Sequence, residues 1–328
     1  MSSVKPLWLC LAGLLLLILA SLLLGAGDTG PLSSLQVLAG LGSAEDRFVV
    51  LELRWPRTLL GMLVGVALGA AGTVLQSATR NPLAEPGLLG VSAGASLALV
   101  IAVALGASSA TVNLAVASAG ALCGCLLVLL VSNVGRLGDD PVRLVLAGAA
   151  FSSLLAAFTS MILLHDQRSA DEIRFWVIGA VAGRSPDTLL WSLPGVLLGL
   201  LALVPLIRPL ASLALGERVA AGLGHHPQLI RLGALLAVAV LVGSATAAAG
   251  PIAFVGLIVP YLARRLVGPD IRRSFPLALL LGPSLLLLAD TVSRLIVRPY
   301  ELPIGVITAL LGAPILIAVV RGQRIPRL

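Results

Sequence analysis

One carboxylate and one arginine stand out because they lie within a long apolar run. Asp290 falls inside Leu277–Ile296, and Arg294 follows it four residues later. An ionisable residue in an apolar helix surrounded by lipid is a functional candidate, so a proton relay through Asp290 is one hypothesis. The acid-then-base spacing also brings both side chains together on one face of a helix. We therefore favour an intramembrane ion pair between Asp290 and Arg294.

Nucleotide-binding and enzymatic motifs are absent from the sequence. Lys5 is the only lysine, and no glycine-rich run precedes it, so the P-loop pattern G-x-x-x-x-G-K-[ST] does not occur. The sequence also contains no H-E-x-x-H or G-x-S-x-G motif and no pair of carboxylates within an apolar run. We predict that the chain is not an enzyme and binds no cofactor, and that any ATP driving it binds to another subunit.

The cysteines and the adjacent histidines favour packing and loop roles. Cys10, Cys123 and Cys125 lie in apolar runs, where cysteine packs as a small residue. A disulfide or a metal site is the alternative. His225 and His226 are sequence neighbours, so their side chains would diverge on a helix and form a poor metal site. We predict no metal site in this chain.

The elements that must position these residues are predicted to be membrane helices. Of the 328 residues, 58% are hydrophobic and 11% are charged, whereas soluble domains carry about 25% charged residues. The mean hydropathy is +1.06. Apolar runs near the membrane-spanning length of about 20 residues recur throughout. The predicted spans are Leu7–Ala26, Leu59–Ser77, Leu88–Leu105, Leu114–Val134, Leu144–Leu164, Leu189–Ile207, Leu229–Ala249, Ile252–Val267, Leu277–Ile296 and Ile304–Val320. The predicted fold class is all-α: one transmembrane domain, residues 1–328, of a polytopic membrane protein.

The basic residues predict the orientation of the chain. Ten spans place both termini on one side of the membrane, and if that side is cytoplasmic, 14 of the 22 basic residues lie inside and 8 outside. This bias follows the positive-inside rule and predicts cytoplasmic N- and C-termini. The net charge of +7 is spread over short gaps between apolar runs, so we predict no nucleic-acid partner. A cleaved N-terminal signal peptide, which would leave nine spans, is the alternative.

Four gaps between the runs look structured. Residues 28–57 and 165–188 are predicted to be partly ordered outer segments, and residues 171–176 are predicted to form a short amphipathic helix at the interface. Two gaps hold helix-breaking residues. We interpret them as a shaped turn and a broken helix whose backbone groups line protein or a cavity rather than lipid, with plain helix hairpins as the alternative. The residues concerned are Asn81, Pro82, Pro86, Gly250 and Pro251.

Several long motifs, in a fixed order, resemble one family. The chain is similar over nearly its whole length to the FecCD-type permeases of type II ABC importers. The resemblance rests on residues 54–57 (RWPR) with 60–76, residues 80–96 (RNPLAEPGLLGVSAGAS), residues 215–224 (LGERVAAGLG), and residues 250–265 (GPIAFVGLIVPYLARR) with the later LLLLADTVSRL and ELPIGVITALLGAP. It implies the type II importer permease fold, with about ten transmembrane helices per chain.

The resemblance also implies roles for residues at the two membrane faces. Residues 215–224 correspond to the coupling helix that fits a groove of the ATPase subunit, with a solvated loop helix as the alternative. The coupling residues are Leu215, Gly216, Glu217, Arg218, Ala221, Leu223 and Gly224. Arg54, Arg57 and Arg294 match family arginines that pair with glutamates of a periplasmic binding protein. Such charges govern encounter rate and orientation, and anchoring at lipid headgroups is the alternative.

The predicted function is that of the permease subunit of an ABC importer carrying an iron chelate, a siderophore or haem, across the bacterial inner membrane. The implied partners are two ATPase subunits that bind ATP and Mg²⁺, a periplasmic substrate-binding protein and a second permease copy, giving a homodimer. Import of vitamin B12 by the same mechanism is the alternative substrate. An ion-coupled secondary transporter is the alternative class, but it would need several intramembrane charges, and this chain offers Asp290 alone.

Overall fold

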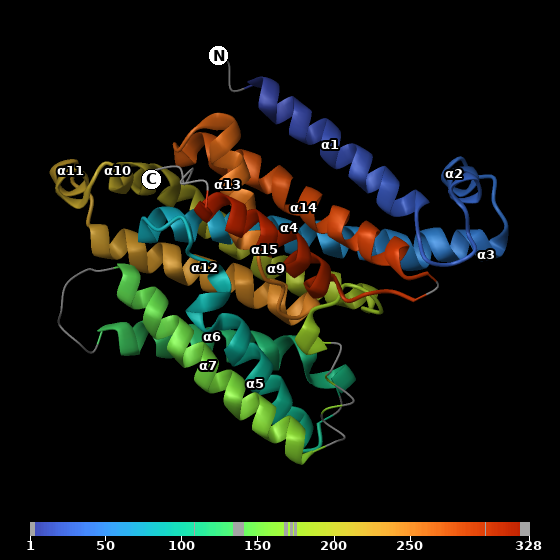
Figure 1. Ribbon diagram of the computed structural model, residues 1–328, viewed down its shortest axis with the longest axis horizontal. Helices are drawn as coiled ribbons and strands as arrows, with labels where there is room; N and C mark the ends of the chain where they lie inside the picture. Colours follow the sequence, from blue (N-terminus) through green and yellow to red (C-terminus); the bar gives the residue numbers. More distant parts are fainter. Residues whose placement is uncertain are drawn as a thin grey trace.

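The computed structural model describes residues 4–107, 109–133, 141–166, 170, 173, 176–298 and 300–321, and its regular elements are all helical. Ten helices coincide with the ten predicted spans, which confirms the all-α fold (Figure 1). They are α1 (Val4–Leu23), α4 (Trp55–Thr79), α5 (Val91–Ala104), α6 (Ser109–Asn133), α7 (Pro141–His165), α9 (Pro186–Leu203), α12 (Pro227–Ala249), α13 (Val255–Val267), α14 (Ile271–Ile296) and α15 (Ile304–Arg321).

Shorter helical elements join these helices. They are α2 (Pro31–Leu38), α3 (Ala44–Arg47), a π-helical turn (Phe48–Arg54), two 3-10 turns (Pro86–Leu89 and Val204–Leu206), α10 (Ile207–Ala214) and α11 (Glu217–Gly222). The π-helical turn joins α3 directly to α4. The segment 28–57, expected to be partly ordered, is therefore helical from Ala44 onward. Of the amphipathic helix expected at residues 171–176, only Ile173 and Trp176 belong to the described part of the chain.

Within the described part of the chain, six helical stretches are long and apolar enough to cross a membrane. They are Lys5–Leu23, Ala44–Thr79, Leu146–His165, Pro186–Ala214, Pro227–Ala249 and Ile271–Ile296. Helix α13 is different, because its 13 residues rise only about 20 Å, less than the roughly 30 Å of a bilayer core. It begins at Val255, three residues later than the predicted span.

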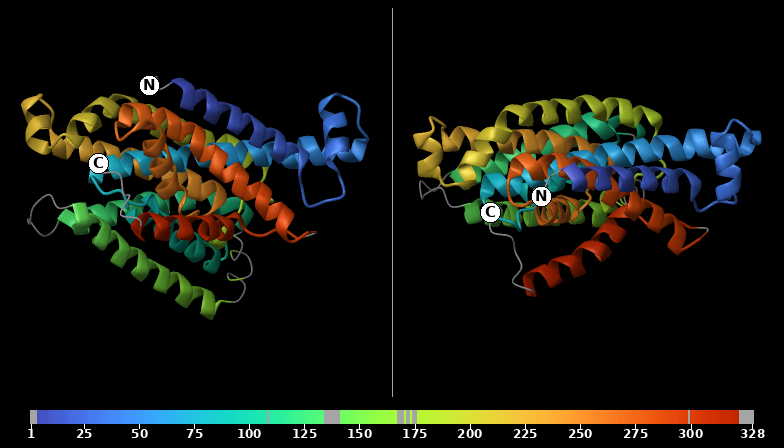
Figure 2. Two further views of the ribbon diagram at one scale, coloured as in Figure 1. Left: turned by 45° about the horizontal axis from the view of Figure 1, so that its top comes forward. Right: turned by 90° about the horizontal axis from the view of Figure 1, so that it is seen from above.

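Helix α4 runs through the middle of the bundle and packs against α12, α13 and α14 (Figure 2). Glycines permit this close approach. A Cβ at Gly72 would collide with the backbone of Gly256 in α13, and a Cβ at Gly65 would lie 2.5 Å from the Cα of Pro283 in α14. Small residues that let backbones meet are the usual means of packing helices in lipid, where the hydrophobic effect does not drive association.

Helices α1 and α7 lie at the periphery of the bundle (Figures 1 and 2). In each of them only 17% of the apolar window is buried, against 78% in the window that includes α4. Exposed side chains such as Trp8, Leu9, Met161 and Leu164 form their outer faces. Surfaces of this kind suit contact with acyl chains.

The two ends of the bundle carry different elements. Helices α10 and α11 lie at one end of the long axis, and α2 and α3 lie at the other (Figure 1). The first residues of α1 and the last residues of α15 lie in the half that carries α10 and α11. We call the end with α10 and α11 the α11 end, and the opposite end the α2 end.

The chain reverses direction between α12 and α13 without a conventional loop. Helix α12 stops at Ala249, Gly250 has φ 74°, and Phe254 has φ 69° immediately before α13. A left-handed conformation is rare for a bulky residue such as phenylalanine. We refer to residues 250–254 as the α12–α13 break. Gly250 and Pro251, the helix-breaking residues singled out in the sequence, lie at the start of this break.

Candidate functional site

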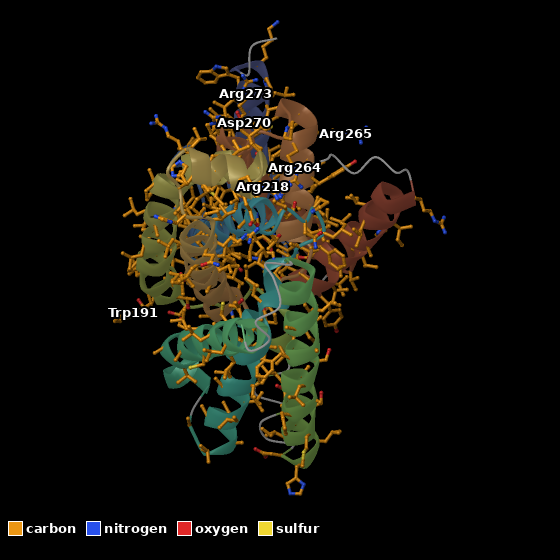
Figure 3. The ribbon with its side chains drawn as sticks, turned by 90° about the vertical axis from the view of Figure 1, so that its left-hand side faces the viewer. Trp191, Arg218, Arg264, Arg265, Asp270 and Arg273 are labelled. Atoms are coloured by element: carbon orange, nitrogen blue, oxygen red, sulfur yellow. The ribbon has the colours of Figure 1, made fainter. Side chains whose placement is uncertain are left out.

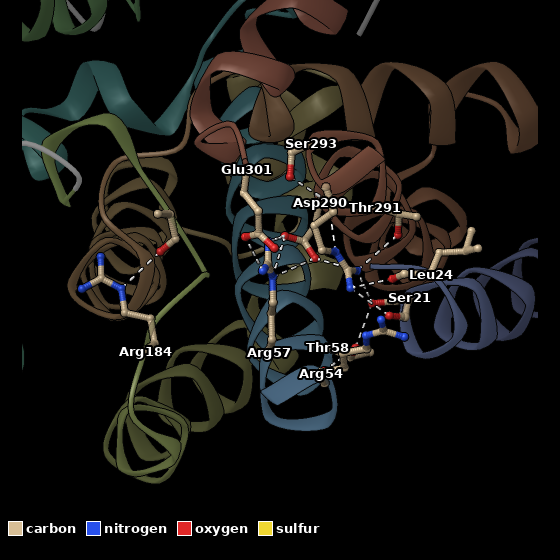
Figure 4. A network of polar contacts seen from close by, with 12 residues as sticks. Ser21, Leu24, Arg54, Arg57, Thr58, Arg184, Asp290, Thr291, Ser293 and Glu301 are labelled. Atoms are coloured by element: carbon tan, nitrogen blue, oxygen red, sulfur yellow. Dashed lines mark hydrogen bonds and ion pairs between the residues drawn. The ribbon is translucent and has the colours of Figure 1, made fainter. Parts of the chain in front are cut away.

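At the α2 end, Arg57 of α4 holds two carboxylates that are remote in sequence (Figure 4). Its Nη2 lies 2.7 Å from Asp290 Oδ1, and its Nε lies 3.0 and 3.2 Å from the two carboxylate oxygens. Its Nη1 lies 2.7 Å from Glu301 Oε2. The contact with Asp290 is bidentate, which is the strong geometry for an arginine–carboxylate pair.

Arg294 contacts the same carboxylate from the other side. Its Nη2 lies 2.9 Å from Asp290 Oδ2, so the two residues spaced four apart on α14 form an ion pair. Its Nη1 donates to the carbonyl oxygens of Ser21 (2.9 Å) and Leu24 (3.0 Å) at the end of α1. The side chains of Asp290 and Arg294 are each 2% exposed. Two arginines and two acids therefore balance one another in this cluster.

Arg54 also binds the end of α1, and its hydrogen-bond acceptors are all uncharged. Its Nη1 donates to the carbonyl oxygens of Leu22 (3.0 Å) and Leu23 (3.1 Å) and to Ser34 Oγ (2.9 Å), and its Nη2 donates to the carbonyl oxygen of Thr29 (3.0 Å). The last carbonyls of a helix lack partners within the helix and favour a cation nearby. Arg54 thus caps the C-terminus of α1.

The three arginines assigned to docking differ in their access to solvent. Arg54 is 5% exposed and Arg294 is 2% exposed, and both direct their donors into the chain. The side chain of Arg57 is 13% exposed, and its partner Glu301 is 31% exposed. In this conformation, the surface-facing part of the cluster is therefore Arg57 with Glu301. Burial argues against direct contact of a partner protein with Arg54 or Arg294.

At the α11 end, the segment Leu215–Gly224 forms a projecting turn around α11. Gly216 (φ 113°) and Gly224 (φ 82°) bracket it with conformations that favour glycine. Leu215, Val219 and Leu223 are spaced four apart and are 70%, 46% and 62% exposed. Val219 and Leu223 share one face of α11, while Leu215 precedes the non-helical Gly216 at its start. We call these three exposed side chains the apolar stripe of the turn.

Charged residues, mostly arginines, lie at the same end of the molecule as the stripe (Figure 3). Arg218 and Ala221 are exposed, while Glu217 is paired with Arg231 of α12. Figure 3 looks onto this end of the molecule, where Arg218, Arg265 and Arg273 are labelled together. A short apolar stripe within a basic surface fits a protein partner better than lipid acyl chains.

The turn after α4 reaches towards the α12–α13 break. Arg80 ends α4 with φ 50°, and Asn81 Oδ1 accepts a hydrogen bond from the Leu83 backbone at 2.9 Å, while Pro82 is half-buried. Pro86 lies close to Gly256 of α13. Of the predicted turn residues on this side, Pro86 therefore packs against α13.

Glu85 lies in the same turn and contacts the break. Its Oε1 accepts a hydrogen bond from the backbone N–H of Phe254 at 2.6 Å. Burial raises the pKa of the Glu85 carboxyl, and the hydrogen bond from Phe254 partly offsets that rise. On the other side of the break, a Cβ on Gly250 would collide with the Trp176 carbonyl oxygen, and one on Gly179 would collide with that of Pro251.

Sequence analysis did not find several of these contacts. Arg57 and Asp290 are 233 residues apart, and no local pattern links them. Gln76 and Glu85 lie within the quoted motif stretches, but sequence analysis assigned them no contact. Each is a polar residue in an apolar or turn-forming segment, and that contrast could have marked them as candidates. Within the described residues, no group of three His, Cys, Asp or Glu side chains is arranged to hold a metal. Cys10, Cys123 and Cys125 are free thiols.

Comparison with known proteins assigns the family. The model of the FecCD transport family matches residues 13–322, which is nearly the whole chain. The chain belongs to the FecCD transport family. This FecCD chain is 48% identical over 314 residues to the ferric enterobactin transport system permease protein of Escherichia coli (strain K12), covering 94% of each chain. It is 37% identical over 323 residues to the hemin transport system permease protein of Yersinia pestis, covering 95% of each.

A solved structure supports the same assignment. The FecCD chain superposes on an inward-facing conformation of a metal-chelate type ABC transporter with a TM-score of 0.82 and 28% identity, covering 98% of this chain and 99% of that one. The predicted family and importer permease fold are therefore confirmed. This FecCD chain is a transport subunit of an ABC importer, and ATP hydrolysis belongs to separate subunits of such importers.

Proposed function

We propose that this FecCD chain is the membrane-spanning subunit of an ABC importer for a ferric siderophore. The main support is the 48% identity, over 94% of both chains, with a permease protein of a ferric enterobactin transport system. A second relative at 35% identity is an Fe(3+)-citrate import permease of Bacillus subtilis (strain 168). Haem is the second candidate substrate, because the hemin permease is 37% identical over 95% of each chain.

The complete transporter proposed here contains two copies of this chain, two ATPase subunits that bind ATP and Mg²⁺, and a periplasmic substrate-binding protein. Residues 1–328 act as a single transmembrane domain in the bacterial inner membrane, with both termini in the cytoplasm. The α11 end would then face the cytoplasm, where positive charge is favoured. The exposed stripe of Leu215, Val219 and Leu223 is the proposed ATPase contact.

The α2 end is the proposed docking face for the substrate-binding protein. Arg57 and Glu301 border solvent there and are the proposed contact residues. Arg54 and Arg294 are assigned a different role, which is to hold the end of α1 beside the docking face. Their hydrogen bonds to α1 support this division of roles.

Reconstituted transport tests the substrate and the energy source together. The chain is co-purified with its ATPase subunits and placed in proteoliposomes with the cognate binding protein. Radioiron-labelled ferric enterobactin should then accumulate only when ATP is hydrolysed, with hemin and cyanocobalamin compared in parallel. Uptake that needs no ATP but collapses with the proton gradient would instead identify a secondary transporter. Selective uptake of hemin or cyanocobalamin would replace the siderophore assignment.

A further inference from the structure

The C-terminal turn of α4 makes a polar contact with α12 and, through it, with α11. Arg231 of α12 pairs with Glu217 of α11, and its Nε donates to the carbonyl oxygen of Ala78 at 3.4 Å. That carbonyl is among the last four of α4, which lack partners within the helix, and a cation there is favoured by the helix dipole. A single arginine thus ties the projecting turn at the α11 end to the end of the central helix.

Gln76 lies two residues earlier on α4 and is fully buried. Its Nε2 lies 3.3 Å from the carbonyl oxygen of Ala84 and 3.5 Å from that of Gly256, and its Oε1 accepts a hydrogen bond from Arg264 Nη2. Arg264 is 3% exposed, and its Nε lacks a hydrogen-bond partner in the part of the chain that the structure describes. One side chain therefore connects α4 both to the turn after it and to α13.

Stability alone does not account for this pair. Replacing a buried polar pair by well-packed apolar residues is often neutral or stabilising, and a buried donor without a partner carries a cost. A helix interface in lipid needs only close packing, which Gly72 and Gly256 already provide between the same two helices. The Gln76–Arg264 contact therefore fixes the relative position of α4 and α13, two helices that already pack closely.

The contacts end at a strained position. Phe254 holds φ 69° just before α13, and its backbone N–H donates to Glu85 of the turn after α4. Strained backbone of this kind persists only where its surroundings hold it, and it is frequent in segments that switch. The ring of Phe254 also packs against Gly312 of α15, where a Cβ would collide with it. A shift of the turn after α4 would therefore displace Phe254 and, through it, both α13 and α15.

We propose that Glu217, Arg231, Gln76, Arg264 and Glu85 form a polar relay that couples movement of α11 to the α12–α13 break, with Gln76 as its central positioning residue. The proposal rests on the proposed function, since it assigns a route by which the ATPase subunits act on the interior of this chain. The relay runs from the surface at the α11 end to α13, the helix that is too short to cross a bilayer core. Helix α4 links the two halves of the relay, because Gln76 and Ala78 lie two residues apart on one continuous helix.

The test measures substrate taken up per ATP hydrolysed by the complete transporter in proteoliposomes. Gln76→Leu keeps the side-chain size but removes all three contacts. Its uptake per ATP should fall roughly tenfold, within the range that residues along a coupling network exert, while ATP hydrolysis continues. Thr73→Val is the matched control, because Thr73 is buried one turn earlier and its hydroxyl bonds only to Gly69 of its own helix (2.8 Å). A wild-type ratio in an assembled Gln76→Leu transporter would overturn the relay.

A double-mutant cycle separates the relay from a merely structural role. Glu217→Gln acts at the partly exposed end of the relay, and it serves as the primary variant if Gln76→Leu fails to assemble. If both residues act in one relay, the double variant should lower the uptake ratio no further than the stronger single variant. Independent, multiplying losses would overturn the proposal. Wild-type transporter that shows no ATP-dependent uptake would refute the proposed function itself, whereas active transporters with unchanged ratios would refute the relay alone.

Discussion

Asp290 is shared by two guanidinium groups in the interior of the protein. Arg57 binds it bidentately from α4, and Arg294 binds it from one turn further along α14. Breaking a buried pair is more costly than never forming it, because the remaining charge loses its compensation. The carboxylate therefore joins α4 to α14. Through Arg294, which bonds to the end of α1, it also links α1 to this junction.

Asp290→Asn should destabilise the protein strongly. The substitution leaves two buried arginines without their common counter-charge, which we expect to cost about 3–5 kcal/mol. Glu301→Gln is the matched control, since Glu301 binds the same Arg57 at a partly exposed site and should cost less than about 1 kcal/mol. Thermal unfolding in detergent measures both. Equal midpoints for the two variants would show that the junction is not a major contributor.

The sequence predicts this cluster only in part. The contact of Asp290 with Arg294 follows from their spacing on one helix. The bonds of Arg57 with Asp290 and Glu301 join residues 233 and 244 positions apart, and only the fold brings them together. Arg54 was assigned to docking because the family resemblance matches it to arginines that pair with glutamates of a periplasmic binding protein. Its acceptors are three backbone carbonyls and Ser34 Oγ, and no sequence pattern links them to Arg54.

Helices α1 and α7 have the smallest buried share, 17% each, among the six stretches long and apolar enough to cross a membrane. The C-terminal end of α1 is nevertheless firmly held, because Arg54 and Arg294 together donate hydrogen bonds to the carbonyl oxygens of Ser21, Leu22, Leu23 and Leu24. The junction between α1 and α2 thus depends on two side chains more than on apolar packing.

Arg54→Ala should loosen this junction. Four polar groups lose a buried donor, and we expect a local cost of roughly 2 kcal/mol or more. Hydrogen exchange in residues 22–34 should quicken, because local opening requires less free energy. Arg47→Ala is the matched control, as Arg47 is exposed on the neighbouring α3. Unchanged exchange in residues 22–34 together with weaker docking would restore Arg54 to its first assigned role.

Element positions could be predicted far better than element breaks. Apolar runs located ten helices of the described chain, because lipid demands apolar segments. The late start of α13 depends on the conformation of Phe254, a residue with no turn-forming tendency. The continuation of α3 into α4 through a π-helical turn was likewise missed, because that stretch includes charged residues.

For the whole molecule, the contrast between its two ends is the main feature. The α11 end presents an apolar stripe within basic surroundings, and the α2 end presents a polar cluster whose charges are largely satisfied internally. The basic residues predict which end faces the cytoplasm, and that orientation stays a prediction. The identity of the partners came from family resemblance, since nothing in composition or spacing specifies an ATPase.

Leu223→Asp should weaken ATPase binding at the α11 end. Leu223 is 62% exposed, so the substitution should leave the fold intact while placing a charge in the proposed contact. We expect a loss of roughly 2 kcal/mol, or about 30-fold in affinity, typical of a central interface residue. Leu41→Asp at the α2 end is the matched control, because Leu41 is 72% exposed. Co-purification of the ATPase with each variant measures the effect, and equal recovery would refute the assignment.

The π-helical turn at Phe48–Arg54 determines where the arginines of the α2 end point. A π-helical turn holds one more residue than an α-helical turn, and each residue of an α-helix advances the next by about 100°. Arg54 belongs to this turn and points to α1, while Arg57 belongs to α4 and points to α14. Removing one residue from the turn would rotate everything before it, so α2 and α3 would approach the bundle on a different side. The number of residues in this one π-helical turn thus determines how α2 and α3 are oriented on the bundle.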